Sequence, residues 1–229
     1  TSFKWTNSAK GQAAVICVII GLEAENDKEK YLFHDGLVMK SSQIGPYLNL
    51  GSKVIVRKCK KSISGLPEMA YGNMPLEGGY LKLSDEEKTK LVEQFPEAIV
   101  LIRPVVGGEE FLKGIRRWCL WIDDDQLEFA LSISEVKRRI QGVREFRTNG
   151  GDVARTLVNR SHQFRYRRES IGSAIVVPCT SSERRNYMQC GFYSKEYISM
   201  NSVQVVYDAS PFIFGLLSSR MHMLWVKAV

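Results

Sequence analysis

The fold is decided around two neighbouring segments, Arg117-Trp-Cys-Leu-Trp-Ile122 and Ser134-Glu-Val-Lys-Arg-Arg-Ile-Gln-Gly-Val-Arg-Glu-Phe-Arg147. The first segment predicts a strand, which the acidic turn Asp123-Asp-Asp125 closes. The second predicts a helix that Ser134 caps and that runs from Glu135 to about Arg147. Its apolar residues recur at spacings near 3.6 and form an inward face: Val136, Ile140, Val143 and Phe146. The opposite face, toward solvent or phosphate, carries Lys137, Arg138, Arg144 and Arg147.

Further elements lie on both sides of this pair. Ser84-Asp-Glu-Glu87 is a capping box, which predicts a helix that ends near Phe95, before Pro96. Ser210 and Pro211 begin a last helix, which runs to about Val226, is apolar nearly all round and should be deeply packed. Strands are predicted for Ala13–Gly21, which reads as buried, and for Lys53–Arg57, Ala174–Pro178 and Val203–Tyr207. The fold class is therefore α+β, with short strands in a mixed sheet packed with a few helices, including the buried C-terminal helix.

Positive charge is concentrated in one window of the chain. Between Lys137 and Arg185, eleven arginines and one lysine face four acidic residues, a net charge of +8, whereas the whole chain carries +7. The planar arginine fork binds phosphate or a guanine edge through two hydrogen bonds, and a positive stripe attracts polyanions. Phe164, Tyr166 and Tyr187 interleave with these arginines, which favours nucleic-acid binding over a solvated helix face with local ion pairs.

The sequence contains few residues or motifs that point to catalysis. We find no glycine-rich dinucleotide motif, no phosphate-binding loop and no zinc-protease motif. The five cysteines and three histidines are widely spaced, which argues against a disulfide framework or a structural zinc site. Asp123–Asp125 reads as a solvated hairpin tip rather than a cation site, and His222 as a hydrogen-bonded core histidine. Trp118 and Trp121 are predicted to be core residues.

The densest polar cluster is Thr180-Ser-Ser-Glu-Arg-Arg-Asn-Tyr187. Its hydroxyls suit phosphates, its arginines suit phosphate or guanine, and its carboxylate can accept from cytosine or orient an arginine. An ordinary loop with a local salt bridge from Glu183 remains the alternative.

The chain shows no stretch of about 18 apolar residues and no secretory signal, and it lacks an initial methionine. We therefore expect a fragment of a longer cytoplasmic protein, with the cysteines reduced.

Several strings, in order, resemble the signatures of the MmeI-like DNA methyltransferases, which are single-chain type IIL (type II) restriction-modification enzymes. These strings are Phe3–Val15, Ile44-Gly-Pro-Tyr-Leu48, Glu110–Gly114 with Arg117–Trp121, Ser181–Tyr187, and Phe214–Val226. The resemblance covers nearly the whole chain, and five ordered matches are more specific than any single one.

The resemblance implies a target-recognition domain of an S-adenosylmethionine-dependent adenine-N6 methyltransferase that also carries an endonuclease. Residues 1–28 would be the last strands of the methyltransferase, and residues 29–229 the DNA-recognition domain. This fragment would have no catalytic residue, metal or cofactor of its own, because the S-adenosylmethionine loop and the Asn-Pro-Pro-Tyr/Phe motif are absent from it. Its partners would be duplex DNA, positioned for base flipping, and the rest of the parent chain.

The expected DNA contacts combine this resemblance with the charge map. They are Ser181, Ser182, Glu183, Arg184, Arg185, Asn186, Tyr187 and Gln189 in and beside the loop, Arg165, Arg167 and Arg168, and in second rank Arg144 and Arg147. Two alternatives stay open: an RNA-binding module, and an enzyme with an unrecognised site around Asp123–Asp125 or His222.

Overall fold

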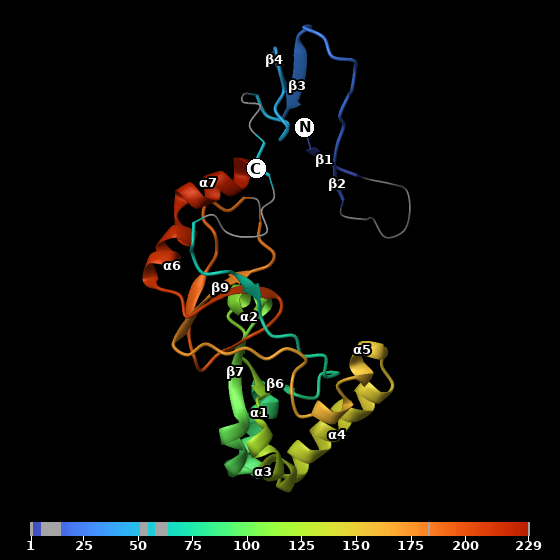
Figure 1. Ribbon diagram of the computed structural model, residues 1–229, viewed down its shortest axis with the longest axis vertical. Helices are drawn as coiled ribbons and strands as arrows, with labels where there is room; N and C mark the ends of the chain where they lie inside the picture. The colour runs from blue at the N-terminus through green and yellow to red at the C-terminus, as the bar shows by residue number, and fades with distance from the viewer. Residues whose placement is uncertain (1, 6–14, 51–54, 58–63, 183, 229) are drawn as a thin grey trace. The chain divides into compact units, whose positions relative to one another are not determined.

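The computed structural model describes residues 2–5, 15–50, 55–57, 64–182 and 184–228. The chain divides into two compact units, residues 1–61 with 226–229 and residues 62–225 (Figure 1). In the first unit, β1 (Ser2–Lys4) pairs antiparallel with β2 (Ile16–Val18), and β3 (Lys30–His34) pairs antiparallel with β4 (Leu37–Ser41).

The strand predicted at Ala13–Gly21 is shorter and more exposed than its sequence indicates. Of its residues, Ala13 and Ala14 lie outside the described part, and only Ile16–Val18 form a strand. Ile16 is 64 % exposed, because β2 pairs only with the three residues of β1 among the described strands. The strand predicted at Lys53–Arg57 is not found at Ile55–Arg57, and its first two residues also lie outside the described part.

The second unit contains two four-stranded sheets. One has the strand order β10-β9-β12-β5 and is antiparallel throughout, with β5 (Ala70–Tyr71), β9 (Ser173–Pro178), β10 (Gly191–Ser194) and β12 (Val203–Tyr207). The other has the order β11-β7-β8-β6, with β6 (Lys82–Ser84), β7 (Ile102–Val106), β8 (Arg117–Leu120) and β11 (Ile198–Ser199); only β11 is parallel to its neighbour. The predicted α+β class and the predicted strands at 174–178 and 203–207 are thus confirmed. The strand predicted at 117–122 is confirmed as far as Leu120, where β8 ends.

Helices occupy the connections of the second unit. They are α1 (Asp85–Gln94), α2 (Gly108–Lys113), α3 (Leu127–Ser132), α4 (Ser134–Thr148), α5 (Asp152–Arg155), α6 (Pro211–Ser218) and α7 (Arg220–Ala228), with 3-10 turns at Pro96–Leu101, Asp124–Gln126 and Val158–Arg160. The capping box of α1 forms as predicted, since the Glu87 N–H donates to Ser84 Oγ at 3.1 Å and the Ser84 N–H donates to Glu87 Oε2 at 2.9 Å. Helix α4 begins one residue earlier than predicted, with Ile133 rather than Ser134 at the N-cap.

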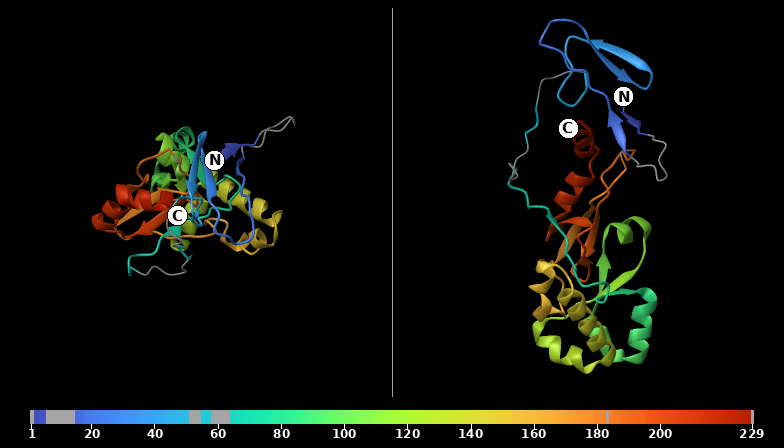
Figure 2. Two further views of the ribbon diagram at one scale, coloured as in Figure 1. Left: turned by 90° about the horizontal axis from the view of Figure 1, so that it is seen from above. Right: turned by 90° about the vertical axis from the view of Figure 1, so that its right-hand side faces the viewer.

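Side-chain alternation along β9 explains how its sheet is covered on both faces. Ala174 and Val176 face a cluster with Val106, whereas Ile175 and Val177 face a cluster with Ile213 of α6. A third and larger core joins the other sheet to α1, α3 and α4, and includes Val136, Ile140 and Val143. Within the second unit, α3, α4 and α5 lie at the opposite end from α6 (Figures 1 and 2).

The last predicted helix is interrupted and only partly buried. Ser219 is extended (φ −70°, ψ 148°), and its hydroxyl accepts from the His222 N–H at 3.1 Å, so the serine ends α6 and caps α7. Ile213 and Met223 are buried, but Phe212 is 65 % exposed and Trp225 is 57 % exposed. The prediction of one deeply packed C-terminal helix is therefore wrong, although His222 does bind the Leu217 carbonyl, at 2.9 Å from Nδ1.

Candidate nucleic-acid interface

Arg147 lies inside the protein and not on the surface of α4. Its side chain is 0 % exposed, and its guanidinium donates to four backbone carbonyls: Leu76 at 3.0 Å, Leu157 at 3.0 Å, Arg160 at 2.6 Å and Gln163 at 2.6 Å. Burial lowers the pKa of this guanidinium. The predicted solvent-facing position of Arg147 is wrong, because the arginine fork turns inward to these loop carbonyls. The carbonyls of Leu157 and Arg160 each accept a backbone N–H as well, whereas no other donor to those of Leu76 and Gln163 is found among the described residues.

Phe146 differs from its prediction in the opposite way. The helical spacing predicts an inward position, yet Phe146 is 40 % exposed and packs against the turn at Gly78. Arg139, which no sequence pattern singles out, is buried instead. It donates to Glu87 at 2.8 Å, Glu135 at 3.1 Å and the Tyr80 carbonyl at 3.0 Å, and it joins α4 to α1.

Arg167 is also largely committed to the fold. It donates to the Ile122 carbonyl at 2.9 Å and to Asp123 at 2.7 Å, and its guanidinium lies 4.2 Å from the centre of the Trp121 ring. Its neighbour in the turn, Asp124, accepts from His162 and Gln163 at 2.8 and 2.9 Å. The acidic turn is therefore a set of anchors for the arginine-rich segment rather than a hairpin tip.

Arg168 is exposed at the surface, whereas Arg165 is half-buried and its guanidinium donates to the Tyr166 hydroxyl at 2.8 Å and to Met74 Sδ at 3.8 Å. Arg165 stacks on Tyr166 and Arg168 on Tyr207, at 4.6 and 4.2 Å from the ring centres, and neither forms an ion pair with a described carboxylate. The Arg168 backbone is fixed by the buried amide of Asn73, which accepts from the Arg168 N–H at 2.5 Å and donates to its carbonyl at 2.9 Å. No sequence signal indicates this role of Asn73, because a single amide among turn residues is common.

The polar cluster forms the loop between β9 and β10. Ser181, Ser182, Arg184, Asn186 and Tyr187 are exposed, and Arg185 is half-buried. The loop is shaped from within, since the Arg184 N–H donates to Ser182 Oγ at 3.3 Å and the Arg185 N–H to the Ser182 carbonyl at 3.1 Å. The side chains of both arginines form no ion pair with any described residue, and Glu183 lies outside the described residues. Gln189 is half-buried, and its Oε1 has no hydrogen-bond partner in the described part of the chain.

The arginine-rich window is split over separate surfaces. The loop follows Pro178 at one end of β9, whereas the turn Ser170–Gly172 precedes Ser173 at the other end. Six strand residues separate them, a distance of about 20 Å. The loop also extends away from α3, α4 and α5, where Arg144 lies (Figure 2, right). Charge that is contiguous in the sequence is therefore not contiguous in space.

Asp208 fixes the turn that follows Arg168. One carboxylate oxygen accepts from the Gly172 N–H at 2.9 Å, the Ser170 hydroxyl at 2.8 Å and the Ile171 N–H at 2.8 Å, and these bonds, led by that of Gly172, hold the pKa of Asp208 below its usual 3.8. Because the folded-state pKa is depressed, this contribution to stability is present above pH 3.8 and is lost as the pH falls through the lower folded value.

We expect Asp208→Asn to reduce the free energy of unfolding at pH 6, and the difference from the wild type to shrink as the pH falls well below 3.8. Denaturant unfolding at several pH values measures this difference. A difference that stayed constant down to the lowest pH would contradict the role assigned to the ionised carboxylate.

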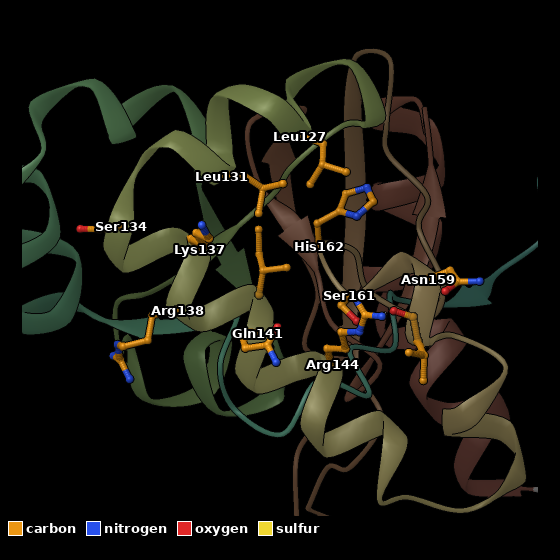
Figure 3. A pocket seen from close by; sticks show the side chains of 12 residues that line it. Leu127, Leu131, Ser134, Lys137, Arg138, Gln141, Arg144, Asn159, Ser161 and His162 are labelled. Atoms are coloured by element: carbon orange, nitrogen blue, oxygen red, sulfur yellow. The ribbon is translucent and has the colours of Figure 1, made fainter.

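A pocket of about 670 Å³ opens between α4, α3 and the segment 158–162 (Figure 3). Its floor is apolar, with Leu127, Leu131, Ile140 and Val158. Lys137, Arg138 and Arg144 stand on its rim, and none of its lining residues is acidic. Among the described residues, no group of His, Cys, Asp and Glu side chains is placed to hold a metal ion, and no helix is long and apolar enough to cross a membrane.

Two family models match this chain. The model of the MmeI target recognition domain matches residues 50–229, and the model of the MmeI DNA-methyltransferase domain matches residues 1–34. The chain belongs to the MmeI family of target recognition domains. The resemblance found in the sequence is confirmed, whereas the boundary predicted after residue 28 of this MmeI-like chain stays a prediction.

Known proteins resemble the MmeI-like chain along its whole length. DNA methyltransferase A of Bacillus subtilis (strain 168) is 39% identical over 230 residues, which cover 100% of this chain and 26% of that protein. The structure of the type IIL restriction-modification enzyme MmeI in complex with DNA matches with a TM-score of 0.86 and 38% identity, over 98% of this chain and 31% of that one. The chain thus spans about a quarter of the length of its curated relative.

Proposed function

We propose that this chain binds duplex DNA sequence-specifically, as the target-recognition part of an adenine-N6 DNA methyltransferase and restriction enzyme. The observation that carries the proposal is the exposed loop between β9 and β10, in which Arg184 and Arg185 are free of ion pairs with described residues. A loop on a rigid sheet, with two guanidinium groups that form no ion pair with a described residue, suits phosphate or guanine recognition. The solved relative is described as a complex with DNA, which supports the choice of ligand.

The proposed contacts follow the accessibility of the side chains. Arg147 and Arg167 donate to acceptors within the fold, so we no longer propose them as DNA contacts. Outside the loop, Arg168 and, on α4, Arg144 are exposed, and Arg165 is half-buried. The remaining proposed contacts are in or beside the loop: Ser181, Ser182, Glu183, Arg184, Arg185, Asn186, Tyr187 and Gln189.

The division of labour within the parent protein is also a proposal. This chain would hold the duplex in register through phosphate contacts, and a few loop side chains would read base edges. The methyltransferase domain, whose family model matches residues 1–34, would receive a flipped adenine and supply the methyl group from S-adenosylmethionine.

The pocket beside α4 does not fit S-adenosylmethionine. That cofactor carries a sulfonium cation, whereas the rim presents Lys137, Arg138 and Arg144 without an acidic lining residue. Like charges at this range disfavour binding of that cation.

Fluorescence anisotropy of the chain with a labelled duplex, over a salt series from about 50 to 200 mM, tests the proposal. Binding should weaken steeply, with a slope of log K against log salt of about −0.9 for each phosphate neutralised. Unlabelled duplex DNA should compete better than duplex RNA or single strands. Preference for RNA, or no binding at the lowest salt by either this chain or the parent enzyme, would overturn it.

A further inference from the structure

The rim of the pocket beside α4 carries cations that the fold does not use. Lys137 and Arg144 are exposed, and neither forms an ion pair with a described residue. Arg138, on the same rim, differs from them, because it donates to both oxygens of Glu135 at 2.6 and 2.7 Å. Glu135 is shared with Arg139, and Glu145 accepts from Gln141 at 3.2 Å, so the acidic residues of the helix are directed to other partners.

The spacing of the two free cations puts them on one helix face. Lys137, Gln141 and Arg144 are separated by four and then three residues, so they share a face of α4. The rise from Lys137 to Arg144 is about 10 Å. Side chains that start from backbone positions this far apart suit two phosphates of the same polyanion.

The surface is also held rigid from below. Arg147 clamps the carbonyls of Leu157, Arg160 and Gln163 against α4, and His162 is fixed by Asp124 at 2.8 Å. The segment that forms the far wall of the pocket is therefore ordered before any ligand arrives. A preformed surface loses little conformational entropy on binding.

We infer that Lys137 and Arg144 form a second phosphate-contacting surface for duplex DNA, separate from the loop between β9 and β10. This inference rests on the proposed DNA-binding function and names a further part of the interface. The cationic rim and the absence of acidic lining residues complement a polyanion. The apolar floor of the pocket has no role in phosphate binding. The alternative ligand for this surface is an acidic protein segment whose apolar side chains fill the pocket.

The experiment compares salt slopes of duplex binding for the whole chain and three charge-matched variants. Lys137→Gln and Arg144→Gln should each reduce the magnitude of the slope by about 0.9 and weaken binding on the order of tenfold at about 0.1 M salt. The loss should be the same for duplexes of different sequence, because phosphates carry no sequence information. Arg138→Gln is the control, because it removes the same charge from the same helix at a paired position.

The outcomes separate this inference from the proposed function. A wild-type slope in both variants, with unchanged thermal unfolding, would overturn the second surface and leave the loop untouched. An equal loss in all three variants would also overturn it, since only net charge would then matter. The inference would also be overturned if Leu131→Ser bound the duplex more weakly while Lys137→Gln and Arg144→Gln kept the wild-type salt slope. In that case the apolar floor of the pocket, and not its cationic rim, would contact the ligand. No binding by the wild-type chain or by the parent enzyme at the lowest salt would instead remove the proposed function, and this inference with it.

Discussion

Replacing Arg147 with methionine should lower the free energy of unfolding by about 3–5 kcal/mol. The side chain is fully buried and satisfies four carbonyls, three in the segment that follows α5 and one in the turn at Leu76. Methionine fills most of the volume but donates no hydrogen bond, so the carbonyls of Leu76 and Gln163 lose their donor, at about 1–3 kcal/mol for each group that water does not reach. The carbonyls of Leu157 and Arg160 lose one of two donors, because each also accepts a backbone N–H. Denaturant unfolding of the chain measures the change.

Arg144→Met is the matched control for that experiment. It removes the same charge three residues earlier on the same helix, but from an exposed side chain, and should change stability by less than about 0.5 kcal/mol. Similar losses in both variants would mean that helix propensity or net charge, and not the carbonyl clamp, governs the effect. A small loss in both would contradict the anchoring role of Arg147.

Short sequence motifs predict the helices and strands that are determined by residues close together in the chain. The helix Asp85–Gln94 is predicted at both ends because a capping box and a following proline act within a few residues of the chain. The strands at Ala174–Pro178 and Val203–Tyr207 are predicted because β-branched residues run continuously where both faces of a sheet are covered.

Contacts between residues far apart in the sequence account for the features that the sequence does not predict. Helix periodicity predicts that Arg147 lies on the polar face of its helix. The sequence pattern does not show that the distant carbonyls of Leu76 and Gln163 need donors, and these carbonyls hold the side chain inside. Hydrophobicity predicts a buried last helix, but Ser219 competes for the backbone and divides it, and most apolar side chains there stay exposed. Composition alone predicts a buried strand at Ala13–Gly21, but composition does not specify how many strands pair with it.

The candidate site is predictable in part. Composition locates the arginine-rich window, and its densest loop is exposed at the end of a sheet. The window nevertheless contains arginines with opposite uses. Arg139, Arg147 and Arg167 bind acceptors inside the fold, whereas the guanidinium groups of Arg168 and Arg184 form no hydrogen bond or ion pair with a described residue. Only three-dimensional distances to carboxylates and carbonyls separate these two groups.

Removal of the loop arginines should have the largest effect on DNA binding. Arg184→Ala and Arg185→Ala should each weaken binding to the preferred duplex by about 1–3 kcal/mol if the guanidinium is bidentate. Neither side chain stabilises the fold through an ion pair with a described residue, so thermal unfolding should stay close to that of the wild type. Arg155→Ala, an exposed arginine of the same window that pairs only with Asp152 at 3.5 Å among the described residues, is the control.

The affinities of each variant for duplexes of several sequences then show whether the replaced arginine contacts a phosphate or a guanine edge. An arginine on a phosphate lowers affinity equally for every duplex and reduces the salt slope by about 1, whereas an arginine on a guanine edge lowers affinity mainly for the preferred sequence. Unchanged affinity in both loop variants, with the fold intact, would exclude the loop as a DNA contact. Recognition would then have to rest on Arg165, Arg168 and the surface of α4, which are held at the other end of β9 or on the helical part of the same unit.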